Sequence, residues 1–519
     1  MMIRTIPLDE VAQHNKQDDL WIIIHGKVYD LTKFLPEHPG GQNIILKYAG
    51  KDGTRAFEPM HPIAIIDRFL SPDVCLGQAA VNPASEETVA ELETEEEKRV
   101  RLAREGMPKL EEMYNSFDFE SVARSVLKAD AYYYFSSGAS DEISMRENHN
   151  AYHRIWLRPR VMVNVAEIAT MTTMLGSKVS MPLYISATAM NKMAHPEAEK
   201  VLTRAAGKCG IIQMIPTLAC YSLDDLVEAR VHSDQPQWFQ LYVDTDRKVT
   251  QRIVQQAEAK GVKGLFITVD LAGIGRREKY LRQKYKQENF ENTQSSDDHK
   301  SKSSGSTTSA PVNKRRGTLV DPSLNWSDIA WFKSITKMPI ILKGIQRYED
   351  AVLAYKYGCA GVVLSNHGGR QLDFSPSPIE ILPEVIDALK CEGCDPRKDF
   401  EVYVDGGIRR GSDIFKALAL GAKGCGIGRP SLYAMACYGD EGVKRLLEIY
   451  QNELEICMRL MGAPTIADIK PEMVDIRNLK NHFVSSPTDY LAQQTYEKLQ
   501  PTRAADGSNS SGGYQLSKL

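Results

Sequence analysis

Eight short apolar runs recur between residues 183 and 428, and they constrain the fold of this chain more than any other feature. Segments with helical periodicity separate them. Eight buried strands alternating with helices over roughly 250 residues predict a (β/α)8 barrel. A doubly wound open sheet is the alternative, but no G-x-G-x-x-G motif follows the first strand. The runs are LYISATA (183–189), IIQMI (211–215), WFQLYV (238–243), GLFITVD (264–270), PIILKG (339–344), GVVLSN (361–366), EVYVDGG (401–407) and GCGIG (424–428).

The rest of the chain divides into further parts. Residues 1–78 form a compact unit in which LWIIIHGKVYDLT alternates around a glycine turn like a β-hairpin. Residues 79–107 are acidic and helix-prone, which predicts a linker or a helix lying across a domain boundary. We expect the barrel domain to span residues 108–485, with a flexible loop near 286–316 and a polar tail over 486–519.

The composition of the 519-residue chain excludes several classes of protein. With 42% hydrophobic and 25% charged residues it is typical of globular proteins, and its length predicts at least two domains. A net charge of -3 without a Lys and Arg block predicts no nucleic acid partner, and no apolar window approaches a membrane span. The sequence begins without a signal-peptide pattern, and nine scattered cysteines predict reduced thiols inside a cell. Cys391 and Cys394 predict a surface loop rather than a zinc site.

The predicted strand ends carry an unusual number of polar side chains. Barrel enzymes build their active sites at the carboxyl ends of the strands. A single polar residue there is ordinarily a satisfied buried group, but many together favour an active site. The residues at the ends of strands three to six are Gln240, Tyr242, Thr268, Asp270, Lys343, Asn366 and His367.

Two glycine-rich runs predict a phosphate site. DGGIRRG (405–411) and GIGRP (426–430) allow the backbone to approach oxygen atoms closely, and Arg409 or Arg429 can neutralise charge. Loops after strands seven and eight are the usual phosphate site of this fold. The sequence therefore predicts a cofactor that carries phosphate.

The run SNHGGRQLD (365–373) sets a base beside an arginine. His367 can remove a proton, and Arg370 can hold a carboxylate through two hydrogen bonds. Asp270, if within hydrogen-bond reach, would orient the imidazole and stabilise its protonated form. Lys343 fits either a Schiff-base nucleophile or a positive charge that faces the electron-rich part of a flavin.

At this point the motifs resemble two known families. VVLSNHGGRQLD, YVDGGIRRGSDIFKALALGA and GIGRP are similar to the FMN-dependent 2-hydroxy acid dehydrogenases and oxidases, which share a (β/α)8 barrel. The first 78 residues resemble cytochrome b5, in which two histidines bind the haem iron. FLPEHPGGQNII places His38 in an H-P-G-G loop, and the second histidine would be His61. One chain with both parts in this order is similar to the flavocytochrome b2 family.

The resemblance implies a role for each matching residue. His367 would be the catalytic base, with Asp270 as its partner and Tyr242 beside it. The substrate would be bound by Tyr134, Tyr242, Arg277 and Arg370. Haem b would be held by His38 and His61. FMN would be contacted by Ala187, Thr188, Ala189, Gln240, Thr268, Lys343, Asp405, Gly406, Gly407, Ile408, Arg409, Gly428 and Arg429.

The resemblance also implies the reaction. An (S)-2-hydroxy acid, L-lactate first, would be oxidised to pyruvate, and electrons would pass through FMN and haem b to a one-electron acceptor such as cytochrome c. Whether hydrogen leaves carbon as hydride or as a proton is open. Two alternatives also stay open: a peroxisomal oxidase of glycolate or lactate that produces hydrogen peroxide, and a haem-binding carrier or sensor with a silent barrel.

Two positions of the barrel bear on reactivity and substrate size. Pro216 stands where the family has a serine that touches the flavin, so we expect one hydrogen bond to the ring to be missing. Leu218 and Ala189 are small enough for a lactate-sized side chain, although apolar pockets discriminate weakly by size.

The end of the sequence bears on location. Ser517, Lys518 and Leu519 have the form of a peroxisomal import signal, which predicts recognition by an import receptor and a peroxisomal protein. Family analogy instead implies the mitochondrial intermembrane space, and it implies a homotetramer.

Overall fold

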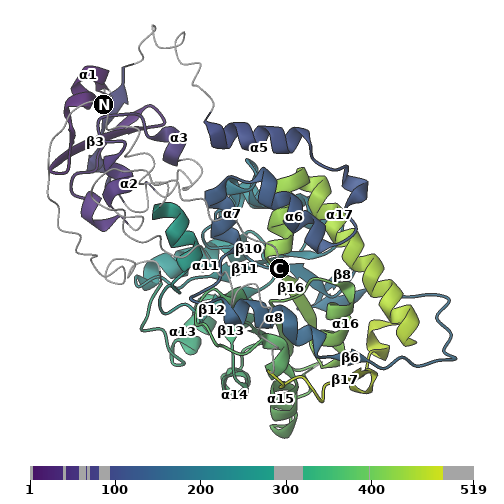
Figure 1. Ribbon diagram of the computed structural model, residues 1–519. Coiled ribbons are helices and arrows are strands. Elements are labelled where there is room, and N and C mark those ends of the chain that lie inside the picture. The colour runs from purple at the N-terminus through teal and green to yellow at the C-terminus, as the bar shows by residue number, and fades with distance from the viewer. Residues whose placement is uncertain are drawn as a thin grey trace, which may run out of the picture. The chain divides into compact units, whose positions relative to one another are not determined.

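The computed structural model describes residues 4–38, 42–57, 66, 70–80, 94–285, 320–396 and 398–482. These residues form an N-terminal domain with a five-stranded sheet and a second domain with a closed barrel (Figure 1). This is the predicted fold class, an α/β barrel preceded by a small α+β domain. The predicted loop near 286–316 and the tail over 486–519 lie outside the described residues.

The N-terminal domain is built on a five-stranded sheet in the order β1-β5-β4-β3-β2. β3 and β4 form the predicted hairpin, and its turn uses His25 and Gly26 with φ angles of 50° and 73°. Two successive positive φ angles match the twist of paired strands. The elements are β1 (Thr5–Ile6), α1 (Leu8–Gln13), β2 (Asn15–Lys16), β3 (Asp19–Ile24), β4 (Lys27–Asp30), η1 (Leu35–Glu37), α2 (Gln42–Leu46), α3 (Thr54–Phe57), η2 (Pro72–Val74) and β5 (Cys75–Ala79).

The isoleucines of β3 fill both faces of this sheet. Ile22 and Ile24 are buried in one apolar cluster, whereas Ile23 is buried in a second one with Ile6 and Val28. This follows because successive side chains of a strand point to opposite faces. The cluster on the Ile22 face consists of Leu20, Ile22, Ile24, Tyr29, Leu31, Leu35, Ile45, Ala49 and Ile66, with Phe34 packed against it.

Eight parallel strands close the barrel in chain order, and the last strand, β16, pairs with the first, β9 (Figure 1). All eight predicted strands are present, and closure excludes the open-sheet alternative. The strands are nearly continuous apolar runs because the barrel interior covers one face and helices cover the other. They are β9 (Leu183–Ile185), β10 (Ile212–Pro216), β11 (Gln237–Leu241), β12 (Leu265–Thr268), β13 (Ile340–Ile345), β14 (Gly361–Leu364), β15 (Glu401–Asp405) and β16 (Gly424–Ile427).

Two of the helices around the barrel show how capping side chains fix a helix start. At α10, the Ser222 hydroxyl accepts from the Asp225 N–H, and the Asp225 carboxylate accepts from the Ser222 N–H. At α11, the Asp246 carboxylate accepts from the Lys248 N–H. The helices are α9 (Glu199–Lys208), α10 (Leu223–Glu228), α11 (Arg247–Ala259), α13 (Asp328–Ile335), α14 (Tyr348–Lys356), α15 (Pro378–Cys391), α16 (Gly411–Ala419) and α17 (Arg429–Met461).

A short hairpin covers the amino-terminal end of the barrel. It consists of β7 (Thr172–Met174) and β8 (Ser177–Val179), and Met174 packs into the interior cluster that contains Trp238 and Phe266. Those two aromatic residues are each the second residue of their strand. The carboxyl end of the barrel therefore stays available for a site.

Part of the acidic segment 79–107 is a helix that belongs to the barrel domain. α5 (Glu95–Glu105) begins with a capping box at Thr94, and Arg99 donates to the carbonyl oxygens of Ser125 and Leu127 at 2.7 and 2.8 Å. Of the two alternatives for this segment, the helix is present from residue 95, and residues 81–93 lie outside the described ones. Three further helices precede the barrel: α6 (Ser116–Val126), α7 (Ala129–Ser136) and α8 (Ile143–His153).

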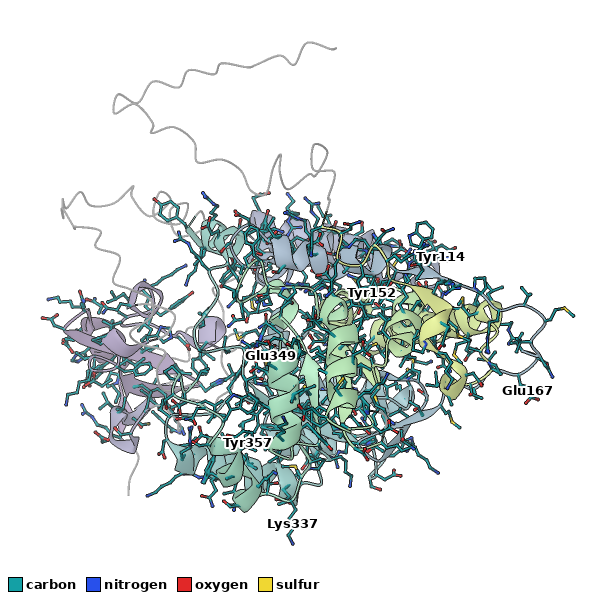
Figure 2. All side chains as sticks on the ribbon, turned by 90° about the horizontal axis from the view of Figure 1, so that it is seen from below. Tyr114, Tyr152, Glu167, Lys337, Glu349 and Tyr357 are labelled. Atoms are coloured by element: carbon teal, nitrogen blue, oxygen red, sulfur yellow. The ribbon has the colours of Figure 1, made fainter. Side chains whose placement is uncertain are left out.

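The remaining elements lie at the edge of the barrel domain. β6 (Trp156–Leu157) pairs with β17 (Val474–Asp475), and Figure 2 shows Glu167 on the projecting loop that follows β6, whereas Tyr152 lies in the interior. Among the helices of the described ranges, none is long and apolar enough to cross a membrane.

Candidate active site

The polar strand ends meet at the carboxyl end of the barrel. Parallel pairing places Pro216 beside Gln240 on β10 and β11, and Thr268 beside Lys343 on β12 and β13. Residues that lie 24 to 75 positions apart in the sequence are thus neighbours across the sheet. The predicted concentration of functional groups at this end is present in the structure.

His367 lies between an acid and a phenol. Its Nδ1 is 2.9 Å from Oδ1 of Asp270, and its Nε2 is 3.5 Å from the hydroxyl oxygen of Tyr242. The Asp270 side chain is fully buried. An ionised carboxylate only accepts hydrogen bonds, so Nδ1 carries the proton and Nε2 is left as an acceptor that can take a proton.

The electrostatics of this trio support those roles. Burial alone would raise the pKa of Asp270, but the nearby His367 outweighs it through charge and hydrogen bonding, so this pKa is lowered. Asp270 therefore stays ionised beside the imidazole. Burial and the charge of Asp270 raise the pKa of Tyr242, so its hydroxyl stays protonated and can donate a hydrogen bond.

Glycines make room for this arrangement. Gly344 has a φ of 112°, and a Cβ there would lie 2.6 Å from the Cβ of Asp270. His367 itself has a φ of 58° and begins a turn completed by Gly368 and Gly369 at 65° and 72°. A left-handed backbone at a histidine costs on the order of 1–3 kcal/mol, so the surroundings must hold this turn in place.

Two arginines flank the ring of Tyr134. The guanidinium carbons of Arg370 and Arg277 lie 5.2 and 5.5 Å from the ring centre. Arg370 also donates to the carbonyl oxygens of Tyr134 and Ser137 at 2.9 and 3.0 Å. Burial and the positive charge of Arg277 lower the pKa of Arg370 to about 9, so it remains cationic at neutral pH. Two neighbouring cations beside a base form a binding site for a carboxylate.

Lys343 is held between two carboxylates. Its Nζ lies 3.4 Å from Oδ2 of Asp405 and donates to the Ser365 hydroxyl at 3.2 Å. Burial alone would lower the pKa of Lys343, but the charges of Asp405 and Asp270 outweigh it and raise this pKa. Lys343 is therefore a fixed positive charge, which disfavours the Schiff-base alternative, since that role needs a neutral amine.

Gln240 and Thr268 form a pair at the ends of β11 and β12. The Gln240 Nε2 donates to the Thr268 hydroxyl at 2.9 Å, and both side chains are buried. Thr217 fixes this amide from the other side, because its N–H donates to the Gln240 Oε1 at 3.2 Å and its hydroxyl to the Gln240 carbonyl at 2.6 Å. The Thr217 hydroxyl also accepts from the Tyr242 N–H at 2.9 Å. Thr217 was missed in the sequence, although it is a polar residue directly after a strand end.

The two predicted phosphate loops lie at the ends of β15 and β16. Gly406 and Gly407 have φ angles of 90° and 84°, a backbone conformation that glycine adopts without strain. Ile408 is buried, and Gly428 is the N-cap of α17, whose first N–H groups lack partners within the helix. These features are those of an anion site.

The two arginines of these loops have protein partners. Arg409 donates to Oε2 of Glu120 on α6 at 2.6 Å. Arg429 donates to the carbonyl oxygens of Phe135, Ser137 and Gly368 at 2.8, 3.0 and 2.9 Å. The Arg429 side chain thus supports the turn of His367 through the Gly368 carbonyl oxygen. No local sequence signal could have marked Glu120, which lies 289 residues from Arg409.

Unpaired buried atoms around these loops fit an FMN molecule. The hydroxyl of Thr188, Oδ1 of Asp405 and the hydroxyl of Tyr433 are buried without a hydrogen-bond partner among the described residues. Such atoms are rare in folded proteins unless a ligand or water completes them. Thr188 lies between Ala187 and Ala189 after β9, and a Cβ on Gly428 would lie 3.9 Å from its methyl group. A polyol and phosphate chain would supply the missing partners.

The haem site is described only in part. His38 follows η1 and is half-buried, with its ring 6.0 Å from that of Phe34 at an interplanar angle of 65°. Phe34 itself packs on the apolar cluster of the sheet. A histidine at the edge of an apolar cluster fits a haem ligand. His61, the second predicted ligand, lies outside the described residues.

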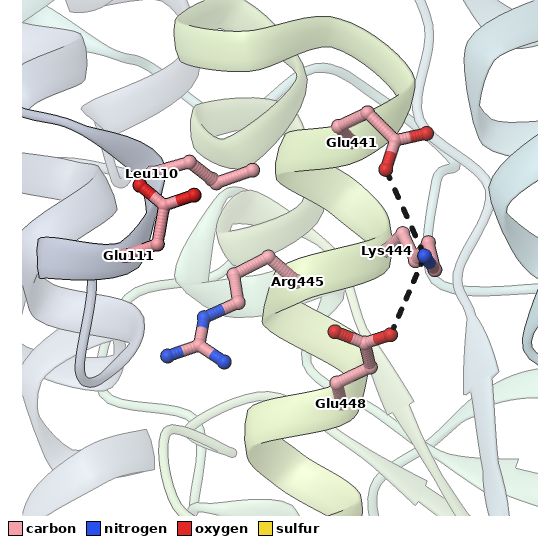
Figure 3. Close-up of a pocket in the computed structure, with 6 residues that line it drawn as sticks. All are labelled: Leu110, Glu111, Glu441, Lys444, Arg445 and Glu448. Carbon is pink, nitrogen blue, oxygen red and sulfur yellow. Dashed lines mark ion pairs between the residues drawn. The ribbon is translucent and has the colours of Figure 1, made fainter.

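A cavity elsewhere on the barrel domain does not belong to this site. It has a volume of about 240 Å³ and lies between η4 (Leu110–Glu112) and α17 (Figure 3). Lys444 pairs there with Glu441 and Glu448 at 3.8 and 3.6 Å. None of the predicted site residues lines it, and its lining carries charged side chains of both signs.

Comparison with known proteins decides the family. The model of the FMN-dependent dehydrogenases matches residues 123–476, which contain every predicted site residue of the barrel. The chain belongs to the FMN-dependent dehydrogenase family. The model of the cytochrome b5-like haem/steroid-binding domain matches residues 7–80. These two matches confirm the predicted cofactors, FMN and haem.

Two yeast proteins match this family member along nearly its whole length. The L-lactate dehydrogenase (cytochrome) of Wickerhamomyces anomalus is 47% identical over 94% of this chain and 83% of that protein. The protein of the same name from Saccharomyces cerevisiae is 45% identical over 94% of this chain and 82% of that protein. The recombinant flavin-binding domain of baker's yeast flavocytochrome b2 has a TM-score of 0.69 at 43% identity, covering 80% of this chain and 100% of the solved one.

Oxidases match a smaller share of this chain. Glycolate oxidase 3 of Arabidopsis thaliana is 40% identical over 72% of this chain and 99% of that protein. Nearly all of that protein is thus matched, while a larger part of this chain stays unmatched than with the two yeast dehydrogenases. The combination of haem domain and barrel in one chain is shared with the cytochrome-linked dehydrogenases.

Proposed function

We propose that this FMN-dependent dehydrogenase oxidises L-lactate to pyruvate and delivers the electrons through its haem domain to cytochrome c. The observation that carries the proposal is the His367 imidazole, backed by Asp270 and placed beside two arginines. A base next to a carboxylate site fits a 2-hydroxy acid. The named activity of the two yeast relatives, which share both domains, supports L-lactate as the substrate and a cytochrome as the acceptor.

The chain's own residues would orient the substrate for the loss of two electrons and two protons. Arg370 and Arg277 bind its carboxylate, and the Tyr242 hydroxyl donates a hydrogen bond to an oxygen of the substrate. Nε2 of His367 accepts a proton, and Asp270 stabilises the imidazolium that results. FMN, when bound, supplies an acceptor that takes electrons in a pair and releases them singly to the haem.

The pocket for the side chain of the substrate supports a small 2-hydroxy acid. Ala189 and Leu218 lie in the loops that follow β9 and β10, and both are half-buried at the carboxyl end of the barrel. Neither carries a polar group, so a methyl group is accommodated without loss of a hydrogen bond. A methylene more or less in such a pocket changes binding by about 1–3 kcal/mol, so selectivity over longer acids is modest.

Visible spectroscopy of the full chain with L-lactate under argon tests the proposal. We expect the flavin absorbance to fall and the reduced haem bands to sharpen, followed by reduction of added cytochrome c. Flavin bleaching without haem reduction, with hydrogen peroxide formed in air, would instead establish the oxidase alternative. An unchanged flavin would leave the silent-barrel alternative.

The variant His367→Ala is expected to bind both cofactors, but its rate of flavin reduction should fall by a factor of about 10²–10⁴.

We also propose a peroxisomal location and a homotetramer for this protein. The location is supported by the tripeptide Ser517-Lys518-Leu519. A fluorescent protein fused in front of residues 486–519 should enter peroxisomes, and deletion of Leu519 should leave it in the cytosol. Import of neither fusion, or of both, would exclude the tripeptide as the signal.

The tetramer is supported by family resemblance, and light scattering of the holoenzyme measures its mass.

A further inference from the structure

Asn148 on α8 and Asn366 at the end of β14 form a closed pair of amides. Nδ2 of each side chain donates to Oδ1 of the other, and both distances are 2.7 Å. The two side chains are 2% and 1% exposed. Each amide thus satisfies a donor and an acceptor of the other in a buried site, where an unpaired amide is costly.

Asn366 also hydrogen-bonds to the turn that carries His367. Its Oδ1 also accepts from the Gly369 N–H at 3.0 Å, and its Nδ2 also donates to the Pro376 carbonyl at 3.1 Å. Asn366 is the residue before His367, whose left-handed backbone is unfavourable by itself. The Asn366 amide therefore closes the strained turn that presents the imidazole.

Asn148 faces the phosphate loop with its backbone. A Cβ on Gly407 would lie 1.8 Å from the Asn148 carbonyl oxygen, so this loop packs directly against α8. The next residue, His149, lies with Nδ1 3.2 Å from the Gly407 carbonyl oxygen. Burial lowers the pKa of His149 to about 4, so its ring is neutral and Nδ1 donates to that carbonyl.

We propose that Asn148 is a positioning residue that fixes the His367 turn relative to the phosphate loop. Through Asn366 its side chain fixes the base, and the same side chain packs against Gly406 while its backbone carbonyl packs against Gly407. This proposal rests on the proposed function, because it assigns to one residue the alignment of base and flavin. Misplacement of reacting groups by about 1 Å can reduce a rate by roughly 100-fold.

The test combines single and double variants of the holoenzyme. Asn148→Ala and Asn366→Ala should each slow flavin reduction at saturating L-lactate by roughly 10- to 100-fold, with little change in the KM for L-lactate. The primary isotope effect with 2-deuterated L-lactate should rise, because cleavage of the carbon-hydrogen bond becomes limiting. The double variant should be no slower than the slower single one, since both changes break the same pair.

A second readout does not depend on turnover. The affinity of the apoprotein for FMN, measured by quenching of flavin fluorescence, should fall by roughly 10-fold in Asn148→Ala, because the Asn148 amide, whose Nδ2 would lie 3.1 Å from a Cβ on Gly406, no longer packs against the phosphate loop. Asn150→Ala is the matched control on the same helix: its Nδ2 donates to Glu147 at 3.2 Å, and its variant should keep wild-type reduction and affinity.

The isosteric variant Asn148→Asp decides the case if the alanine variant does not fold. The ionised carboxylate introduced by this change would still accept from Asn366 but could not donate to it, so flavin reduction should again be slower than in the wild type. Reduction and FMN affinity within twofold of the wild type in these variants, or losses that multiply in the double variant, would overturn the proposal. Failure of the wild type itself to reduce FMN would refute the proposed function. The FMN affinity of the variants would then still test whether Asn148 positions the phosphate loop.

Discussion

Asp270 and His367 lie 97 residues apart in the chain, yet Oδ1 of one is 2.9 Å from Nδ1 of the other. They follow β12 and β14, two strands that are separated by β13. Gly344 on β13 leaves the space through which the two side chains meet, since a Cβ there would lie 2.6 Å from the Asp270 Cβ. Asp270 and His367 can thus pair because their strands are separated by only one strand, and because that strand carries a glycine at the point of contact.

We expect that Asp270 supports catalysis by His367 through its negative charge rather than through its shape. Asp270→Asn keeps the volume and an acceptor for Nδ1, but it cannot stabilise an imidazolium. We expect flavin reduction by L-lactate to slow by about 10²–10⁴-fold with FMN still bound, measured by stopped-flow absorbance. Asp246→Asn, which retains a cap at α11, is the control and should be unaffected. Equal rates for both variants would show that Asp270 is not the partner of the base.

The buried Lys343 is expected to stabilise the fold as well as the flavin. Lys343→Met leaves Asp405 and Asp270 without their buried cation, and breaking a buried ion pair costs about 3–5 kcal/mol. Urea unfolding followed by tryptophan fluorescence should show this loss. Lys356→Met removes an exposed ion pair with Glu392 and should cost less than about 1 kcal/mol. A similar small loss in both variants would contradict the assigned role of Lys343.

Residues at the strand ends were predictable from sequence because barrel topology brings all eight ends to one place. Once the apolar runs are recognised, Gln240, Thr268, Lys343 and His367 must lie near one another. The pairing of His367 with Asp270 was expected if the two lay within hydrogen-bond reach, since a catalytic imidazole needs an orienting acceptor. These parts of the site are confirmed as neighbours in the structure.

The supports of the site were not predictable in the same way. Asn148 and Glu120 come from helices before the barrel, and their contacts with Asn366 and Arg409 span 218 and 289 residues. No periodicity or spacing fixes where such a helix docks. Arg409 or Arg429 was expected to neutralise phosphate, and no signal in the sequence indicated that the Arg429 guanidinium also donates to three carbonyl oxygens. Side-chain direction at a loop depends on the neighbours that tertiary packing supplies.

Arg277 is expected to contribute to substrate binding more than to the chemical step. Arg277→Met removes one of the two cations beside Tyr134, and a charge-assisted hydrogen bond is worth about 1.5–3 kcal/mol. The KM for L-lactate should therefore rise by roughly 10- to 100-fold, with a smaller change in kcat. Steady-state reduction of cytochrome c measures both. Arg276→Met changes an exposed neighbour that pairs with Glu278, and it should leave the KM unchanged. A KM that rises equally in both variants would point to a general loss of positive charge.

Glu199 is expected to make the stability of the barrel depend on pH. This carboxyl at the start of α9 is fully buried, and burial raises its pKa to about 7 from the ordinary 4.5. Between these two values the folded chain holds a proton that the unfolded chain has released, so the free energy of unfolding falls as pH rises from about 4.5 to 7.

Glu199→Gln should remove this dependence. The amide oxygen can still accept from the Cys220 N–H, as Oε2 of Glu199 does at 3.0 Å, but it never ionises. A shift from 4.5 to about 7 corresponds to roughly 3 kcal/mol, so the variant should be more stable than the wild type by up to that amount at pH 8. At about pH 4, below both pKa values, the difference should nearly vanish. Urea unfolding at the two pH values measures it, and Glu448→Gln, an exposed partner of Lys444, is the control. A variant that is equally or less stable than the wild type at pH 8 would show that Glu199 is ionised in the folded barrel at no cost.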